Sequence, residues 1–120
     1  MPKNKEFGNQ GEHIAKEYLQ KKGYLIRDCN WRFGHLEIDL IAENKDFIVF
    51  FEIKTRSTNY FGEPENFVSK RQQQNIIRTA SRYMEIKNCE KEVRFDIISI
   101  LQSADKNIIK HLENAFSPSW

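Results

Sequence analysis

The sequence has few cysteines, no long apolar run and almost no net charge. Its two cysteines, Cys29 and Cys89, lie far apart without a C-x-x-C pattern, which predicts neither a disulfide framework nor a zinc knuckle. No window approaches the length of a membrane span, and the N-terminal stretch lacks the apolar core of a signal peptide. We therefore expect a cytoplasmic protein that does not enter the membrane. A net charge of +2 is too small to indicate a nucleic-acid partner by itself.

Several familiar catalytic motifs are absent as well. The sequence contains no G-x-S-x-G, no P-loop and no G-x-G-x-x-G, which argues against a serine hydrolase, an NTPase and a dinucleotide-binding enzyme. His13, His35 and His111 have neither H-x-x-x-H nor Cys/His spacing to bring them together. We predict that they are surface or packing residues.

Apolar periodicity predicts two helices and five strands. The helices are expected at residues 9–22 and 67–86, and the strands at residues 24–31, 36–42, 47–54, 93–101 and 107–112. Because both faces of the central strands are apolar and need cover, we expect an α/β fold in which helices flank a mixed five-stranded sheet. We expect a single domain over residues 1–120, with irregular tails at residues 1–7 and 117–120.

Two charges stand at the end of an otherwise apolar strand, in the run Phe50-Phe51-Glu52-Ile53-Lys54. A buried strand has little reason to carry charges unless they are used. Because side chains alternate along a strand, Glu52 and Lys54 project from the same face, about 6 to 7 Å apart. This pattern suggests a functional site.

A two-residue turn at Lys45-Asp46 would set the register between the second and third strands. In that register Asp39 faces Glu52, with Cβ atoms about 5 Å apart. Like charges so close destabilise a sheet unless a divalent cation such as Mg²⁺ lies between them and keeps water and substrate phosphates as its other ligands. The same register sets Glu37 opposite Lys54. Whether Lys54 serves chemistry or forms a plain cross-strand ion pair is left open.

Lys54 and Glu12 would complete such a site. Lys54 could position a water nucleophile or stabilise charge on a phosphodiester in the transition state. Glu12 lies at the margin of the core-facing stripe of the first helix and could reach the metal through water. Taken singly, Glu12 is better explained as a carboxylate near a helix N-terminus, and Asp39 as a solvated strand end. The convergence of all four ionisable groups favours a site.

Basic and aromatic residues follow this region. Candidates for nucleic-acid contact are Arg56, Lys70, Arg71 and Gln73, with Tyr60 and Phe61 in the loop between. Basic groups with interleaved aromatics suit phosphate contact and base stacking. Lys70 and Gln73 are the better candidates because they continue the inward stripe of the second helix. The alternative, at least as good for Arg78 and Arg82, is a solvated helix face.

The motifs together resemble those of the YraN family of small bacterial proteins, over nearly the whole chain. They are Gly8-Asn-Gln-Gly-Glu12, Asn30-Trp-Arg32, Glu37-Ile-Asp-Leu-Ile41, Phe50-Phe-Glu-Ile-Lys-Thr-Arg56, Phe61-Gly-Glu-Pro64, Arg94-Phe-Asp96 and Asn114-Ala-Phe116. The spacing of Asp39 and Glu52-Ile53-Lys54 also resembles the PD-(D/E)XK nuclease core, and the family is similar to archaeal Holliday junction resolvases. One departure is Leu36, where the family pattern has glycine.

The resemblance implies a restriction-endonuclease-like fold and an endonuclease that acts on branched or structured DNA with Mg²⁺ or Mn²⁺. It assigns metal binding to Asp39 and Glu52, catalytic assistance to Lys54 and a supporting carboxylate to Glu12. A nuclease with one site that cuts two strands is expected to pair, so a homodimer is one expectation. Two alternatives stay open: a non-catalytic nucleic-acid-binding protein that keeps the fold, and an RNA-processing nuclease with the same site.

Overall fold

The computed structural model describes residues 3–57, 68–103 and 105–118. Two helices and five strands follow one another in the predicted order of elements. They are α1 (Lys3–Lys21), β1 (Leu25–Phe33), β2 (Leu36–Glu43), β3 (Phe47–Ser57), α2 (Lys70–Lys87), β4 (Glu92–Gln102) and β5 (Asn107–Phe116). The predicted loop at residues 57–66, with Tyr60 and Phe61, lies almost wholly outside the described residues.

The strands form one sheet in the order β1-β2-β3-β4-β5. β3 and β4 are parallel, and the other neighbours are antiparallel. A parallel pair needs a long crossover connection, and the segment that contains α2 makes it. The expected mixed five-stranded sheet flanked by helices is therefore confirmed, and it is compatible with a restriction-endonuclease-like fold.

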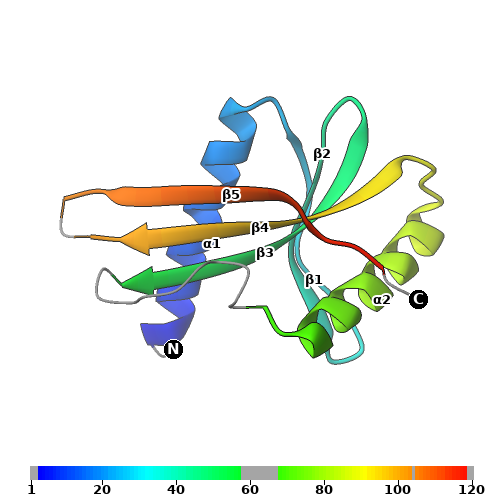
Figure 1. The fold of residues 1–120 in the computed structure, drawn as a ribbon, viewed down its shortest axis with the longest axis horizontal. Coiled ribbons are helices and arrows are strands. Elements are labelled where there is room, and N and C mark those ends of the chain that lie inside the picture. The colour runs from blue at the N-terminus through cyan, green and yellow to red at the C-terminus, as the bar shows by residue number, and fades with distance from the viewer. Residues whose placement is uncertain (1–2, 58–67, 104, 119–120) are drawn as a thin grey trace.

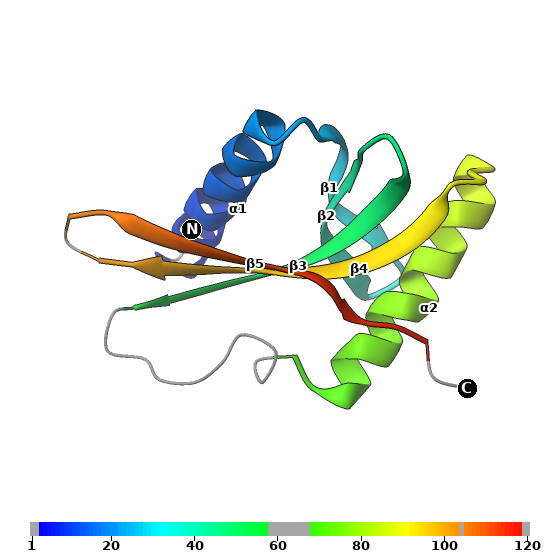
Figure 2. The same cartoon turned by 45° about the horizontal axis from the view of Figure 1, so that its top comes forward.

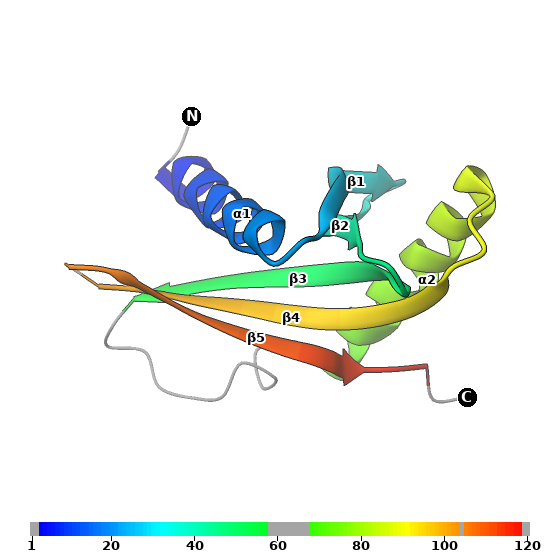
Figure 3. The ribbon, with the colours of Figure 1, turned by 90° about the horizontal axis from the view of Figure 1, so that it is seen from above.

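The two helices cover opposite faces of the sheet and create two core layers. The α1 layer contains Ala15 and Leu19 with Phe51, and the α2 layer contains Ile77 and Tyr83 with other strand residues. In Figure 1, α1 crosses behind β3 to β5, and α2 lies toward the other end of the sheet, as Figure 2 also shows. The β1–β2 hairpin rises steeply from the plane of β3 to β5 (Figure 3).

The turn between β2 and β3 has the predicted two-residue loop. The backbone N–H of Asn44 donates to the carbonyl of Phe47, which leaves Lys45 and Asp46 as the loop residues. The Asn44 side chain accepts hydrogen bonds from the backbone N–H groups of Asp46 and Phe47, a common way for asparagine to stabilise a turn. The pairing of Leu40 with Phe51 follows the predicted register.

Several element boundaries differ from those expected, among them boundaries of α1, α2 and β5. Helix α1 begins at Lys3, so most of the expected tail at residues 1–7 is helical; lysine and glutamate in this stretch are good helix formers. Helix α2 begins at Lys70 because Ser69 and Gln72 form a capping box that sets its start. Strand β5 continues to Phe116, beyond the expected end at residue 112, and residues 117–118 have no regular structure.

No helix in the described ranges is long and apolar enough to cross a membrane.

Candidate active site

Both strands of the β1–β2 hairpin change faces at one level of the sheet. Residues two apart on a strand normally share a face. Cys29 instead packs in the α1 layer and Trp31 in the α2 layer, and in β2 Leu40 and Ile38 differ in the same way. Cys29 pairs with Leu40, and Trp31 pairs with Ile38. Asn30 and Asp39 lie between these pairs, at the level where the strands change faces (the crossover). The tip of the hairpin therefore supports the α2 layer, whereas its base contributes to both layers.

Asp39 lies where β2 and β3 separate. Their pairing runs from Glu43 to Leu40 on β2 and goes no further. Beyond Leu40 the Asp39 carboxylate, rather than the β2 backbone, accepts a hydrogen bond from β3: Ile53 N–H donates to Asp39 Oδ2 at 2.8 Å. This bond holds the Asp39 side chain against β3, directly beside Glu52. The predicted proximity of Asp39 and Glu52 is what the structure shows, although a side-chain bond replaces the strand pairing.

Burial and negative charge raise the pKa of Asp39 to about 7. Desolvation is the larger cause, and the charge of Glu52 comes next; the hydrogen bond from Ile53 opposes them, and Glu37 adds a smaller repulsion. Neighbouring carboxyl groups disfavour each other's ionisation, so Asp39 keeps its proton to a higher pH than an ordinary aspartate.

Lys54 forms an ion pair with Glu52, with Nζ and Oε2 3.1 Å apart and both side chains more than four-fifths buried. Glu37, the cross-strand partner considered from the sequence, pairs with Arg32 at 3.4 Å instead. The plain Glu37–Lys54 ion pair is therefore not formed. Lys54 and Glu52 share a face of β3, as the alternation predicted, and Lys54 remains beside the acidic pair.

Glu12 is held at the crossover by other residues. Asn30 Nδ2 donates to its Oε1, and the Lys16 ammonium lies 3.4 Å from its Oε2. Its side chain is 20% exposed. These contacts put Glu12 across β1 from Asp39 rather than in direct contact with Asp39, Glu52 or Lys54. The sequence placed Glu12 correctly at the margin of the helix but did not identify its partners.

Gly11 allows α1 to approach the end of β3. A Cβ atom at this position would overlap the Thr55 hydroxyl, and it would also contact the end of the Ile100 side chain. Any larger residue would push the helix away from the strand that carries Glu52 and Lys54. The close approach brings the turn of α1 that contains Glu12 to the edge of the site.

The four residues predicted to contact nucleic acid fall into two groups in the structure, two exposed and two half-buried. Lys70 and Arg71 are exposed on the first turn of α2, so Lys70 does not continue the buried stripe as expected. Gln73 is half-buried, and its side-chain amide donates to the carbonyl of Val68, just before the start of α2. Arg56 is half-buried at the end of β3, and its guanidinium donates to the carbonyl of Thr55 at 2.9 Å. The helix start at Ser69 turns the first residues of α2 away from the sheet.

The donor set at the crossover fits a magnesium or manganese ion. In the described part of the chain no three His, Cys, Asp or Glu side chains are grouped as ligands of one ion. Asp39 and Glu52 form a pair, and hard divalent cations are commonly bound by one or two carboxylates with water and substrate phosphate as further ligands. Burial and, next, the charge of Glu52 raise the pKa of Asp39, and a cation between the two carboxylates would replace that repulsion with an attraction.

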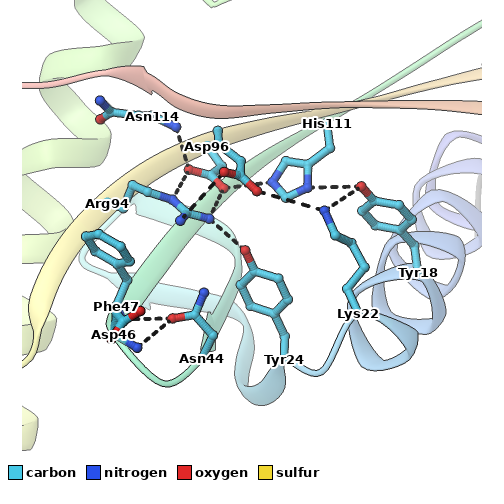
Figure 4. A network of polar contacts seen from close by, with 11 residues as sticks. Tyr18, Lys22, Tyr24, Asn44, Asp46, Phe47, Arg94, Asp96, His111 and Asn114 are labelled. Carbon is cyan, nitrogen blue, oxygen red and sulfur yellow. Dashed lines mark hydrogen bonds and ion pairs between the residues drawn. The ribbon is translucent and has the colours of Figure 1, made fainter.

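A second polar cluster was not predicted. Asp96 on β4 is fully buried and accepts hydrogen bonds from Arg94, from the His111 ring and from the backbone N–H of Asn114 (Figure 4). His111 also contacts the Tyr18 hydroxyl at 3.1 Å, which joins β5 to α1. His111 is therefore buried and packs against aromatic rings, which agrees with the expected packing role, and it also belongs to a polar network that was not expected. A charge inside the apolar run around Asp96 was the available signal.

The raised pKa of Asp39 predicts a stability change with pH in the metal-free protein. Between about pH 4 and pH 7 the folded chain keeps a proton that the unfolded chain has lost, so the free energy of unfolding falls as pH rises. Asp39→Asn imitates the protonated form. The free energy of unfolding of the variant should therefore rise relative to that of the wild type across this window, by up to about 4 kcal/mol above pH 7. Urea denaturation at several pH values in EDTA measures this difference.

Asp46→Asn, at an exposed turn residue, is the matched control and should show little such gain. A stability difference between Asp39→Asn and the wild type that stays constant from pH 4 to pH 8 would contradict the raised pKa.

The fold and site define a class: a mixed α/β protein with two interacting carboxylates and a lysine where two central strands separate. The model of the family described as "Uncharacterised protein family UPF0102" matches residues 11–100. A UPF0102 protein of Christiangramia forsetii is 39% identical over 116 residues, covering 97% of this chain and 98% of its own. One of Alkaliphilus oremlandii is 43% identical over 116 residues, covering 94% and 99%. The chain belongs to the UPF0102 family, the YraN-like family that the motifs indicated.

Proposed function

We propose that the protein is a metal-dependent endonuclease that hydrolyses phosphodiester bonds in branched or otherwise structured DNA in the cytoplasm, with Mg²⁺ or Mn²⁺ as cofactor. The observation that carries this proposal is the Asp39–Glu52 carboxylate pair with Lys54 on the same strand face. Buried like charges without a full set of protein partners are a cost that a bound cation would remove.

Asp39 and Glu52 would hold the ion. When bound, Mg²⁺ or Mn²⁺ polarises a phosphate oxygen and supplies an acidic water. The Ile53 N–H bond keeps the Asp39 carboxylate against β3, so both acids face one point. Lys54 now pairs with Glu52, and with a cation held by Glu52 its ammonium would be available to stabilise the charge that develops on the phosphate.

Exposed positive charge supports a polyanionic substrate. Lys70 and Arg71 are exposed on the first turn of α2, which carries no acidic residue. Arg56 lies two residues beyond Lys54 on β3. Such cations neutralise phosphates irrespective of base sequence. They favour recognition of nucleic-acid shape, and the homodimer expected for two-strand cutting belongs to the same proposal.

The test is cleavage of a substrate panel by the wild-type protein. Four-way junctions, flaps, single strands and duplex DNA, with matched RNA versions, are incubated with Mn²⁺ or Mg²⁺ and, separately, with EDTA. We expect divalent-dependent cleavage of at least one structured DNA and no cleavage in EDTA. Cleavage of RNA alone would replace the DNA proposal with the RNA-processing alternative. Absence of cleavage on every substrate would contradict a nuclease function.

A non-catalytic nucleic-acid-binding role is the second candidate. It is favoured by one observation: Lys54 and the Ile53 N–H already provide each carboxylate with a partner in the absence of an ion. Calorimetric titration with Mn²⁺ separates the two functions. A metal site predicts uptake by the wild type that Glu52→Gln loses, whereas equal heats from the two proteins favour the non-catalytic role.

A further inference from the structure

Asn30 has an unusual backbone conformation for the interior of a strand. Its φ angle is 50°, in the left-handed region, within β1. Among residues with a side chain, asparagine and aspartate tolerate this region best. The residues on either side keep their pairing with β2, so the left-handed turn is confined to one position. It is the position at which β1 changes faces.

The amide of Asn30 is used as well as its backbone. Its Nδ2 donates to Glu12 Oε1, while the Lys16 ammonium lies 3.4 Å from the other oxygen of the same carboxylate. Each oxygen of Glu12 therefore has its own donor. Gly11, the residue before Glu12, packs directly on Thr55 of β3. The helix turn and the carboxylate are both held in one orientation.

Asn30 and Asp39 face each other across the hairpin. The pairs Cys29–Leu40 and Trp31–Ile38 flank them on both sides, so the two residues lie at the same level of the hairpin. The hydrogen bond from Asn30 thus fixes a carboxylate from α1 at the level of the hairpin where Asp39 lies and the sheet opens.

We propose that Asn30 is a positioning residue of the metal site: its left-handed backbone makes the crossover, and its amide holds the Glu12 carboxylate toward the Asp39–Glu52 pair. The inference rests on the proposed function, because it gives Glu12 a place among the groups around a bound ion or its waters. Outer groups that orient metal-site carboxylates commonly change metal affinity about 10- to 100-fold when removed.

Two substitutions separate the backbone role of Asn30 from the role of its amide. Asn30→Gly keeps access to the left-handed region and loses the amide, whereas Asn30→Ala loses both. Mn²⁺ affinity is measured by calorimetry and the midpoint of thermal unfolding by circular dichroism. We expect Asn30→Gly to keep a near-wild-type midpoint and to weaken Mn²⁺ binding about 10-fold. Asn30→Ala should lose both stability and affinity.

A double-mutant cycle with Glu12→Ala tests whether Asn30 acts through Glu12. If it does, Asn30→Gly has no further effect on Mn²⁺ affinity in the Glu12→Ala background. Independent, multiplying effects of the two substitutions would overturn the inference, as would wild-type affinity in Asn30→Gly. Asp39→Asn is included as a further variant. If Asp39→Asn loses Mn²⁺ binding and the Asn30 variants do not, the proposed metal site is supported and the role of Asn30 is rejected. Absence of Mn²⁺ uptake by the wild type would overturn both proposals.

Discussion

Lys54→Met is expected to reduce phosphodiester cleavage about 10²- to 10³-fold, the usual cost of removing one group that stabilises transition-state charge. Mn²⁺ affinity should stay unchanged or increase. The reason is the ion pair between Lys54 and Glu52, 3.1 Å long, in which the ammonium competes with a cation for the same carboxylate. Methionine keeps the length and apolar stem of lysine without the charge. Single-turnover cleavage and Mn²⁺ calorimetry on the same preparation measure the two quantities.

Lys91→Met is the matched control for this experiment. Lys91 also forms an ion pair, with Glu43 at 2.9 Å. Its ammonium contacts the turn between β2 and β3 rather than the Asp39–Glu52 pair. It should leave cleavage near the wild-type rate. If Lys54→Met also cleaves at the wild-type rate, then Lys54 neutralises Glu52 and takes no part in the chemistry.

Asp96→Ala should destabilise the protein by about 3 to 5 kcal/mol, the range for removal of one partner from a buried ion pair. Asp96 is fully buried, and the Arg94 guanidinium and His111 ring that donate to it are 11% and 4% exposed. Burial opposes ionisation of Asp96, but hydrogen bonds from His111, Arg94 and Asn114 outweigh it and lower the pKa of the carboxyl. Alanine would remove the shared acceptor of all three donors inside the protein. Urea denaturation at neutral pH gives the change in the free energy of unfolding.

A milder variant keeps this prediction testable if Asp96→Ala does not fold. Asp96→Asn retains the shape and one acceptor oxygen, so its loss should be smaller. Asp46→Ala, at an exposed turn residue, is the control and should change stability by no more than about 0.5 kcal/mol. A loss below about 1 kcal/mol in Asp96→Ala would show that the network contributes little to the fold.

The acidic pair was predictable because it depends on local rules. The turn residues at Lys45 and Asp46 set the hairpin register, and period-two alternation put Glu52 and Lys54 on one face. The register also identified Asp39 as the neighbour of Glu52. It could not show that strand pairing ends at Leu40, since that depends on how β2 bends away from β3.

The residues around the acidic pair were harder to predict from the sequence. The helical wheel put Glu12 at the edge of the core, but its hydrogen bond to Asn30 depends on a left-handed residue that breaks the alternation. His111 was expected to be a surface or packing residue because histidine spacing carried no signal. Its partners, Asp96 and Tyr18, are brought to it by β4 and α1 from distant parts of the chain.

By itself, the sequence determined the order of helices and strands, the β2–β3 register and the residues of the acidic pair. These follow from apolar periodicity and turn chemistry, which act over a few residues. Only the tertiary structure decided which partner Lys54 takes, where the hairpin changes faces, and that Asp96 is the centre of a buried network. Each of these depends on packing between segments distant in the chain, and such packing selects among several partners that local patterns leave equally available.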